Sequence, residues 1–249
     1  MLNYIKSELY RTKYRKNSYI FILICSILAI LGSVGLLRMR EYEHFYMDIV
    51  IEMCIQAFSI IYFFTLLIVD NVFSEEYKHH TLKNTVASGI SRSKIYLGKF
   101  ITEIIYAIIS FTIIVLVLLL SSYLILGADV GIGNILKDFG LRIVMAFPIW
   151  VAGISIANCL AFIVKNNTFF AVCFMLLMFV PSKTIAIVSL FKPWVAKLTN
   201  WLPSTYVSDL IVNNGFSVEL LGKCYGIAIL YIILSIVIGM SIFNRREIK

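Results

Sequence analysis

The chain has 249 residues, of which 60% are apolar and only 14% are charged. A soluble domain contains about 45–50% apolar and about 25% charged residues, so this composition excludes an ordinary water-facing globule and predicts an integral membrane protein. The formal net charge is +8. Because the basic residues cluster beside long apolar runs, we interpret them as orientation signals and contacts to anionic lipid, not as a surface for nucleic acid.

Six apolar runs predict six transmembrane helices in one membrane domain that occupies residues 1–249. In lipid every backbone polar group must be satisfied within its own segment, so we expect an all-α integral membrane protein. Pro181 and Lys183 are expected to interrupt the fifth run. The predicted spans are residues 19–37, 50–72, 100–127, 142–164, 168–190 and 223–243.

The basic residues also predict the orientation of the spans. The segment before the first span and the loop between the second and third spans each contain five Lys or Arg residues. Loops rich in Lys and Arg remain in the cytoplasm, so both termini are expected there. An even number of spans is required for this arrangement, and six satisfies it.

Residues 1–17 are expected to form a helix that lies in the membrane interface. Leu2, Ile5, Leu9 and Thr12 fall on one helical stripe, and basic residues surround the rest of the helix. The alternative is a disordered basic tail that serves only to orient the first span.

The loop after the second span predicts a separate cytoplasmic helix over residues 74–88. Ser74 can cap its start, Glu75 and Glu76 suit the positive end of a helix dipole, and Gly89 can end it. Ser91 can then cap the helix that leads into the third span. A short polar helix held beneath the membrane is suited to docking on a cytoplasmic partner.

The segment between the fifth and sixth spans mixes apolar stretches with Pro193, Trp194, Trp201 and Pro203. Aromatic residues and prolines at a membrane edge favour short re-entrant helices before the sixth span. An ordinary amphipathic loop is the alternative.

The sequence contains no P-loop for ATP, because neither of its Gly-Lys pairs is followed by Ser or Thr. Glu75 and Glu76 stand four residues before His79 and His80, a spacing that could place two Glu-His pairs on one helix face. We consider three interpretations: a solvated face near a partner, which we favour, a catalytic site of an intramembrane protease, and regulatory ion binding. We predict no catalytic residue, no metal site and no cofactor.

Asp70, Glu103 and Lys183 lie within or at the ends of apolar runs. Asp70 and Glu103 are expected to be interfacial and paired with basic residues, or, if buried, to belong to a transport pathway or gate. Lys183 is expected either to extend toward the interface or to line that pathway.

The loop sequence Phe73, Glu76, Thr81-Leu82, Ile90-Ser91-Arg92, Ile95 and Lys99 resembles the acidic-then-basic loop of the type 2 permease family of ABC exporters. The order of predicted elements over nearly the whole chain is also similar to this family. Among its members, the short chain with small outer loops looks most like the bacterial permeases of lantibiotic immunity or bacitracin-type peptide resistance.

The resemblance implies a permease subunit in the bacterial cell membrane that exports an amphiphilic or hydrophobic substrate, such as an antimicrobial peptide. Its implied partners are a cytoplasmic ABC ATPase, a second permease (an identical copy or a sister chain) and membrane lipids. An intramembrane hydrolase and an ATP-independent channel or sensor are the alternatives. The implied ATPase-coupling residues are Glu75, Glu76, His79, Thr81, Leu82 and Lys83.

Overall fold

The computed structural model describes residues 1–39, 46–79, 82–128, 131–164, 166–212 and 217–245; within these ranges the side chains of 74–79, 82–83 and 167 are not described. Every regular element in the described ranges is a helix. The elements are α1 (Leu2–Lys13), α2 (Lys16–Met39), α3 (Met47–Gln56), η1 (Ala57–Ile60), α4 (Ile61–His79), α5 (Leu82–Ala87), α6 (Arg92–Leu126), α7 (Ile132–Ile163), α8 (Asn167–Ser189), η2 (Pro193–Trp201), α9 (Pro203–Val212) and α10 (Val218–Arg245).

Six segments of the described chain are long and apolar enough to cross a membrane. Five are the single helices α2, α6, α7, α8 and α10, and the sixth is formed by α3, η1 and the first part of α4. Each overlaps one of the ranges expected from the sequence. The expectation of an all-α integral membrane protein with six spans is therefore confirmed.

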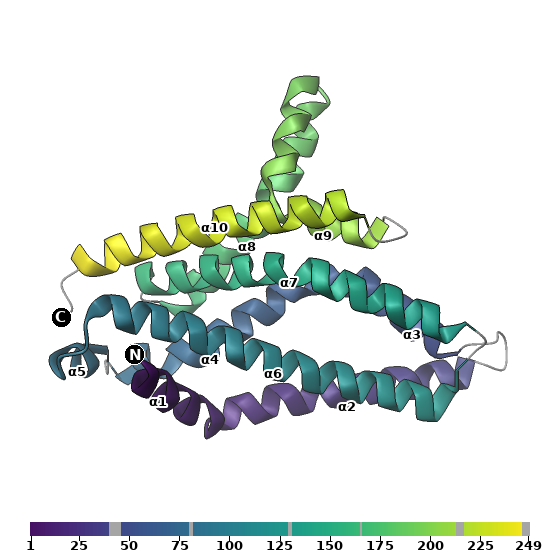
Figure 1. Cartoon of the computed structure of the whole chain (residues 1–249), viewed down its shortest axis with the longest axis horizontal. Coiled ribbons are helices and arrows are strands. Elements are labelled where there is room, and N and C mark those ends of the chain that lie inside the picture. The colour runs from purple at the N-terminus through teal and green to yellow at the C-terminus, as the bar shows by residue number, and fades with distance from the viewer. Residues whose placement is uncertain (40–45, 80–81, 129–130, 165, 213–216, 246–249) are drawn as a thin grey trace.

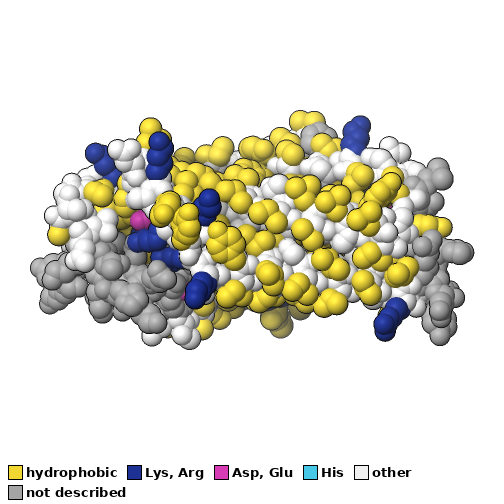
Figure 2. Space-filling view, turned by 90° about the horizontal axis from the view of Figure 1, so that it is seen from below, with side chains coloured by type: hydrophobic (Ala, Val, Ile, Leu, Met, Phe, Trp, Pro, Cys, Tyr) yellow, Lys and Arg dark blue, Asp and Glu magenta, His cyan; other side chains and the backbone are white. Residues whose placement is uncertain are grey.

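Most of the long helices run side by side, and α1, α5 and the last turn of α10 lie at one end of the bundle, which we call the terminal end (Figure 1). The opposite end contains the start of α3 and the end of α6, where the Met47 backbone N–H donates a 3.1 Å hydrogen bond to the Gly127 carbonyl. Figure 2 shows apolar side chains over the middle of one face and Lys and Arg side chains toward the two ends. This distribution fits a bundle whose middle lies in lipid.

Helix α7 lies at the centre of the bundle and packs most extensively against α10, and also against α3, α4 and α9. Its buried face carries small residues, including Ala152, Gly153 and Ala157. A Cβ atom at Gly153 would lie 3.5 Å from the Tyr62 ring, so the ring of α4 packs directly on the α7 backbone. Small side chains let helices approach closely in lipid, where packing replaces the hydrophobic effect as the driving force.

Two of the expected spans differ in detail from the structure. The second is not one continuous helix, because a 3₁₀ turn at Ala57–Ile60 separates α3 from α4. The fifth is not interrupted by Pro181, which lies inside α8. The Ser182 hydroxyl donates to the Phe179 carbonyl and the Thr184 hydroxyl to the Val180 carbonyl, each at 2.9 Å, so side-chain hydroxyls add hydrogen bonds to the helix backbone beside the proline.

Two short helices, η2 and α9, precede α10. Helix α9 packs on α7, buries Tyr206, Val207 and Leu210, and is held by the Arg142 guanidinium, which donates to the Leu210 carbonyl. Helix η2 packs instead on α8. In Figure 1 the green segment formed by the end of α8 and η2 projects away from the other helices.

Candidate functional site

The expected coupling residues lie at the terminal end, but they are divided between two helices. Glu75, Glu76 and His79 belong to the last turns of α4, Leu82 and Lys83 begin α5, and Thr81 lies outside the described residues. The side chains of the other five are also not described. This part of the structure therefore locates the backbone of the expected site.

The prediction that a new helix begins at Ser74 is wrong. Helix α4 continues from Ile61 through Ser74 to His79, and the separate helix α5 covers only Leu82–Ala87. No Gly or Pro interrupts the sequence of α4, so Ser74 and the two glutamates extend a helix that is already formed. The helix of the second span thus continues beyond its apolar part toward α5.

The connection from α5 to α6 is a tight turn at Gly89. The Ser88 N–H donates to the Asn84 carbonyl at 3.0 Å, and Gly89 has a φ of 86°, a left-handed conformation that glycine adopts without strain. Ser91 then precedes α6 in an extended conformation, as expected, but its side chain accepts no capping hydrogen bond. Helix α5 is therefore joined to α6 by a short, defined turn.

Arg92 ties this turn to the last span. Its Nη1 donates to the backbone carbonyls of Phe243 at 2.9 Å and Asn244 at 2.7 Å, and its guanidinium lies 5.9 Å from the centre of the Phe243 ring. A cation is stabilised by the carbonyls at the C-terminal end of a helix and disfavoured at an N-terminal end. Arg92, the first residue of α6, thus finds its partner at the end of α10, and the sequence analysis did not identify this contact.

An aromatic cluster lies beside this contact and joins four helices. The ring of Phe162 in α7 lies 4.9 Å from Phe73 of α4, 4.8 Å from Tyr96 of α6 and 4.5 Å from Phe243 of α10, measured between ring centres. All four rings are buried. The helices that flank α5 are therefore in contact with the last span through packed rings.

Helix α1 docks on α6 through a buried ion pair. The Lys99 Nζ lies 3.5 Å from Glu8 Oε2 and 4.6 Å from the centre of the Phe73 ring, and Arg11 contacts the same Glu8 oxygen at 2.5 Å. The Tyr4 ring covers Gly98, where a Cβ atom would lie 2.5 Å from the ring. A glycine at this position is what permits the close approach.

The protein covers only part of the apolar stripe predicted on α1. Ile5 and Thr12 are buried, but Leu2 is 73% exposed, and the buried face also contains Tyr4 and Glu8. Tyr4 and Glu8 are buried because of the residues opposite them in α6. Lys99 pairs with the Glu8 carboxylate, and Gly98 leaves room for the Tyr4 ring. Neither partner is visible from the periodicity of α1 alone.

The junction of α1 and α2 is also held by polar contacts. The Arg15 guanidinium donates to the Asn71 carbonyl of α4, and the Asn71 side-chain amide donates to the Ser18 hydroxyl at 2.6 Å. The Ser18 hydroxyl donates to the Thr12 carbonyl at 2.8 Å. The N-terminal helix is thus fixed to both α4 and α6 at the terminal end.

The three candidate pathway residues lie on three helices. Asp70 is half-buried in α4, next to Asn71, and Lys183 is exposed in the second half of α8. Glu103 is fully buried in α6, one turn after Lys99, and neither carboxylate oxygen has a hydrogen-bond partner among the described residues. Of the two carboxylates, Glu103 is thus buried and not interfacial, whereas Asp70 is half-buried.

Comparison with known proteins identifies the family of the chain. No curated protein matches the chain. A sequence model of the family described as "ABC-2 family transporter protein" matches residues 4–182, which contain most of α1, the expected coupling region and most of α8. The match covers well over half of the chain and confirms the resemblance to type 2 ABC permeases. The chain therefore belongs to the ABC-2 family of transporter proteins, the membrane permeases of ABC transporters.

Proposed function

We propose that the protein exports an amphiphilic or hydrophobic substrate from the bacterial cell or its membrane, driven by a separate cytoplasmic ATPase that docks on the end of α4 and on α5. Antimicrobial peptides of the lantibiotic type are the substrate class we favour. The observation that carries this proposal is the position of α5, beyond the spans at the terminal end and joined to α6 by the Gly89 turn.

The charge distribution supports a cytoplasmic terminal end. Helix α1, the α1–α2 junction and the start of α6 together contain most of the basic residues of the described terminal end: Lys6, Arg11, Lys13, Arg15, Lys16, Arg92, Lys94 and Lys99. An excess of Lys and Arg is typical of cytoplasmic segments. An ATPase in the cytoplasm would then reach α5 without crossing the membrane.

The contacts beneath α5 supply a route from ATPase movement to the spans. Displacement of α5 would move the start of α6, and Arg92 would carry this movement to the end of α10. The Phe162 cluster links the same helices to α4 and α7. Packed contacts of this kind favour discrete arrangements, which an inward-facing and an outward-facing state require.

The proposed second permease would cover the projecting end of α8 and η2. Leu190 and Phe191 are 81% and 82% exposed, and Trp194 of η2 is also exposed. In the membrane such a surface contacts either lipid or another protein. A second copy or a sister chain on this side would enclose a substrate path that one chain leaves open.

A photo-crosslinking amino acid at Asn84 tests the docking site. Asn84 is an exposed residue of α5, and we expect its crosslinked product in living cells to contain an ABC ATPase, identified by mass spectrometry. The matched control is the same amino acid at Lys137, an exposed residue of α7 near the opposite end. Crosslinks from Asn84 only to lipid, throughout transport, would contradict the proposal.

Charge reversal tests coupling. We expect Glu75→Lys/Glu76→Lys to abolish ATP-driven transport and peptide resistance while the permease still reaches the membrane. Glu52→Lys, at an exposed position of α3 toward the opposite end, is the control and should leave both unchanged. Normal transport after replacement of residues 75–83 by a Gly/Ser linker would exclude this docking site.

A further inference from the structure

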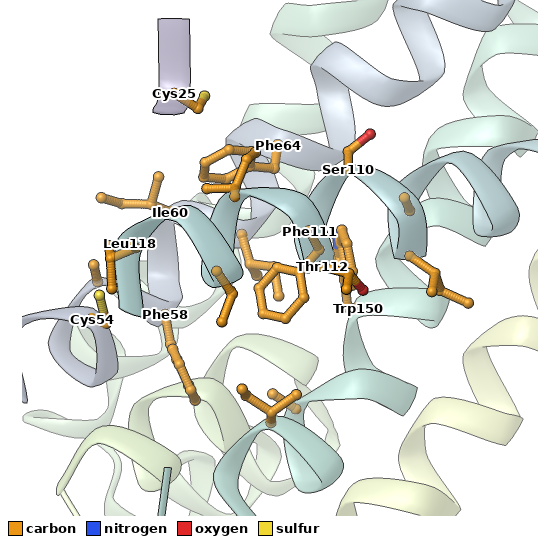
Figure 3. A pocket seen from close by; sticks show the side chains of 18 of the residues that line it. Cys25, Cys54, Phe58, Ile60, Phe64, Ser110, Phe111, Thr112, Leu118 and Trp150 are labelled. Atoms are coloured by element: carbon orange, nitrogen blue, oxygen red, sulfur yellow. The ribbon is translucent and has the colours of Figure 1, made fainter. Parts of the chain in front are cut away.

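A cavity of about 510 Å³ lies within the bundle, separate from the terminal end. Its walls come from α2, the α3–η1–α4 segment, α6 and α7, as shown in Figure 3 by Cys25, Phe58, Phe111 and Trp150. The volume falls in the range of known ligand sites, which is about 300–1,000 Å³. The lining residues all belong to membrane-spanning segments.

The break at η1 produces this cavity. Helices α3 and α4 both contact α6, but η1 between them packs on α9. The space between η1 and α6 is therefore a consequence of the fold, and Ala57 and Ile60 of η1 lie on its wall.

Two polar groups on the cavity wall, the Ser110 hydroxyl and the Trp150 indole N–H, are already engaged, and Thr112 is a further polar residue on a wall that is otherwise mostly apolar. The Ser110 hydroxyl donates to the Tyr106 carbonyl at 2.7 Å, and the Trp150 indole N–H donates to the Thr65 hydroxyl at 3.0 Å. The Thr65 hydroxyl in turn donates to the Ile61 carbonyl at 3.0 Å. No charged residue lines the cavity among the parts of the chain that the structure describes. A polar ligand would therefore lose its water and gain few hydrogen-bond partners on this wall, which favours an apolar occupant.

Residues on the rim connect the cavity with the lipid-facing surface. Leu28 of α2 is 61% exposed and Ile60 of η1 is 47% exposed, although both line the cavity. At this depth the surrounding medium consists of acyl chains. An empty apolar space forfeits dispersion contacts that a chain entering from the bilayer would restore.

We propose that this cavity binds an acyl chain of a membrane phospholipid, which enters past α2 and η1 and fills the space between η1 and α6. The bound acyl chain then packs against the helices that surround the cavity. This inference concerns a site away from α5 and does not depend on the ATPase or on the exported substrate.

Quenching of tryptophan fluorescence can detect the bound acyl chain directly. The protein contains three tryptophans, and Trp194→Phe/Trp201→Phe leaves only Trp150, which is 4% exposed and lines the cavity. The single-tryptophan protein is reconstituted in phosphatidylcholine vesicles with or without bromine atoms on the acyl chains. Because bromine quenches indole emission only on close approach, we expect a loss of emission in the brominated vesicles.

Filled variants show whether the loss comes from the cavity. Ala146→Leu enlarges a cavity residue one turn before Trp150, and Ala57→Phe fills the space from the opposite wall. We expect either change to abolish the bromine-dependent loss, whereas Ala186→Leu on the exposed face of α8 should preserve it. Equal emission from Trp150 in the two lipids, or the same loss in both filled variants, would overturn the proposal.

Discussion

Helices α7 and α2 both have the length and composition of membrane spans, but α7 is mostly buried within the protein and α2 is mostly exposed. In the most apolar window of each helix, 72% of the residues of α7 and only 6% of those of α2 are buried within the protein. The window of α2 also has the higher mean hydropathy of the two, 2.8 against 2.0. The more apolar window is thus the more exposed one, the reverse of the arrangement expected in a soluble protein.

The difference in burial follows from the fact that lipid, and not water, surrounds the spans. Lipid tails are as apolar as a protein core, so burial of large aliphatic side chains against other helices brings no transfer free energy. Helix α2 directs Leu23, Leu28 and Leu31 outward, whereas α7 buries Gly153 and Ser155. Close packing of small, polar and aromatic residues marks the inside of this bundle.

The largest expected difference between the two regions concerns Phe162 in α7. Phe162→Ala removes the central ring of the aromatic cluster and leaves a void among Phe73, Tyr96 and Phe243. A buried Phe→Ala change in a soluble protein costs about 3–5 kcal/mol, and because the cavity part of this cost remains in lipid we expect a loss of about 3 kcal/mol in unfolding free energy. Reversible unfolding in detergent, followed by circular dichroism, measures this value.

Leu31→Ala in α2 is the matched control, since Leu31 is 58% exposed. Its side chain faces the surrounding lipid or detergent, and its loss should change the unfolding free energy little. Equal destabilisation by the two changes would show that α2 is not peripheral.

A second test concerns the Arg142 contact that attaches α9 to α7. Arg142→Met removes the donor to the Leu210 carbonyl and the 2.6 Å ion pair with Asp138. Hydrogen bonds to charged groups contribute about 1.5–3 kcal/mol each, so we expect the opening free energy of α9 to fall by that order. Hydrogen exchange of the α9 amides measures this opening, and Lys137→Met, at an exposed position of α7, should leave the exchange rates unchanged.

A third test compares two glycines. A Cβ atom at Gly239 of α10 would clash with the hydroxyl oxygen of Tyr96, which donates to the Ser235 carbonyl at 3.2 Å, whereas Gly35 of α2 has open space around it. Overpacking costs about 1–3 kcal/mol, so Gly239→Leu should lower the unfolding free energy by this amount. Gly35→Leu should be tolerated, and a similar loss in both variants would contradict the assignment of α2 to the lipid face.

The smallest expected effect depends on pH and concerns Asp209 of α9. Burial raises the pKa of this carboxyl, and the charge of Lys223 partly opposes the shift. A raised pKa means that the folded state binds the proton more tightly, so Asp209 contributes stability at low pH that is lost as the pH rises through its folded pKa. Asp209→Asn should therefore stabilise the protein slightly at neutral pH and not below about pH 4, the ordinary pKa of Asp.

The control for this prediction is Lys223→Met, which removes the opposing charge. In that background the benefit of Asp209→Asn at neutral pH should increase. Thermal unfolding followed from pH 4 to pH 8 compares the four proteins, and a benefit that grows on acidification would contradict the sign.

Much of the fold was predictable from the sequence because helix formation in a membrane depends on the local sequence of each span. Long uncharged runs identified six spans, since each run must satisfy its own backbone. The tight turn at Gly89 was also predictable, because a glycine between helical segments readily adopts a left-handed conformation. The assignment to the ABC-2 family followed from the order of these elements together with the residues of one loop.

Only the tertiary structure decided which face of each helix packs against another helix and which faces lipid. Glu8 is buried because Lys99 lies opposite it, Arg92 reaches the end of α10, and the break at η1 opens a cavity beside α6. These partners are far apart in sequence. Since lipid and protein interior are equally apolar, hydropathy locates a span along the chain but does not show which of its sides meets another helix.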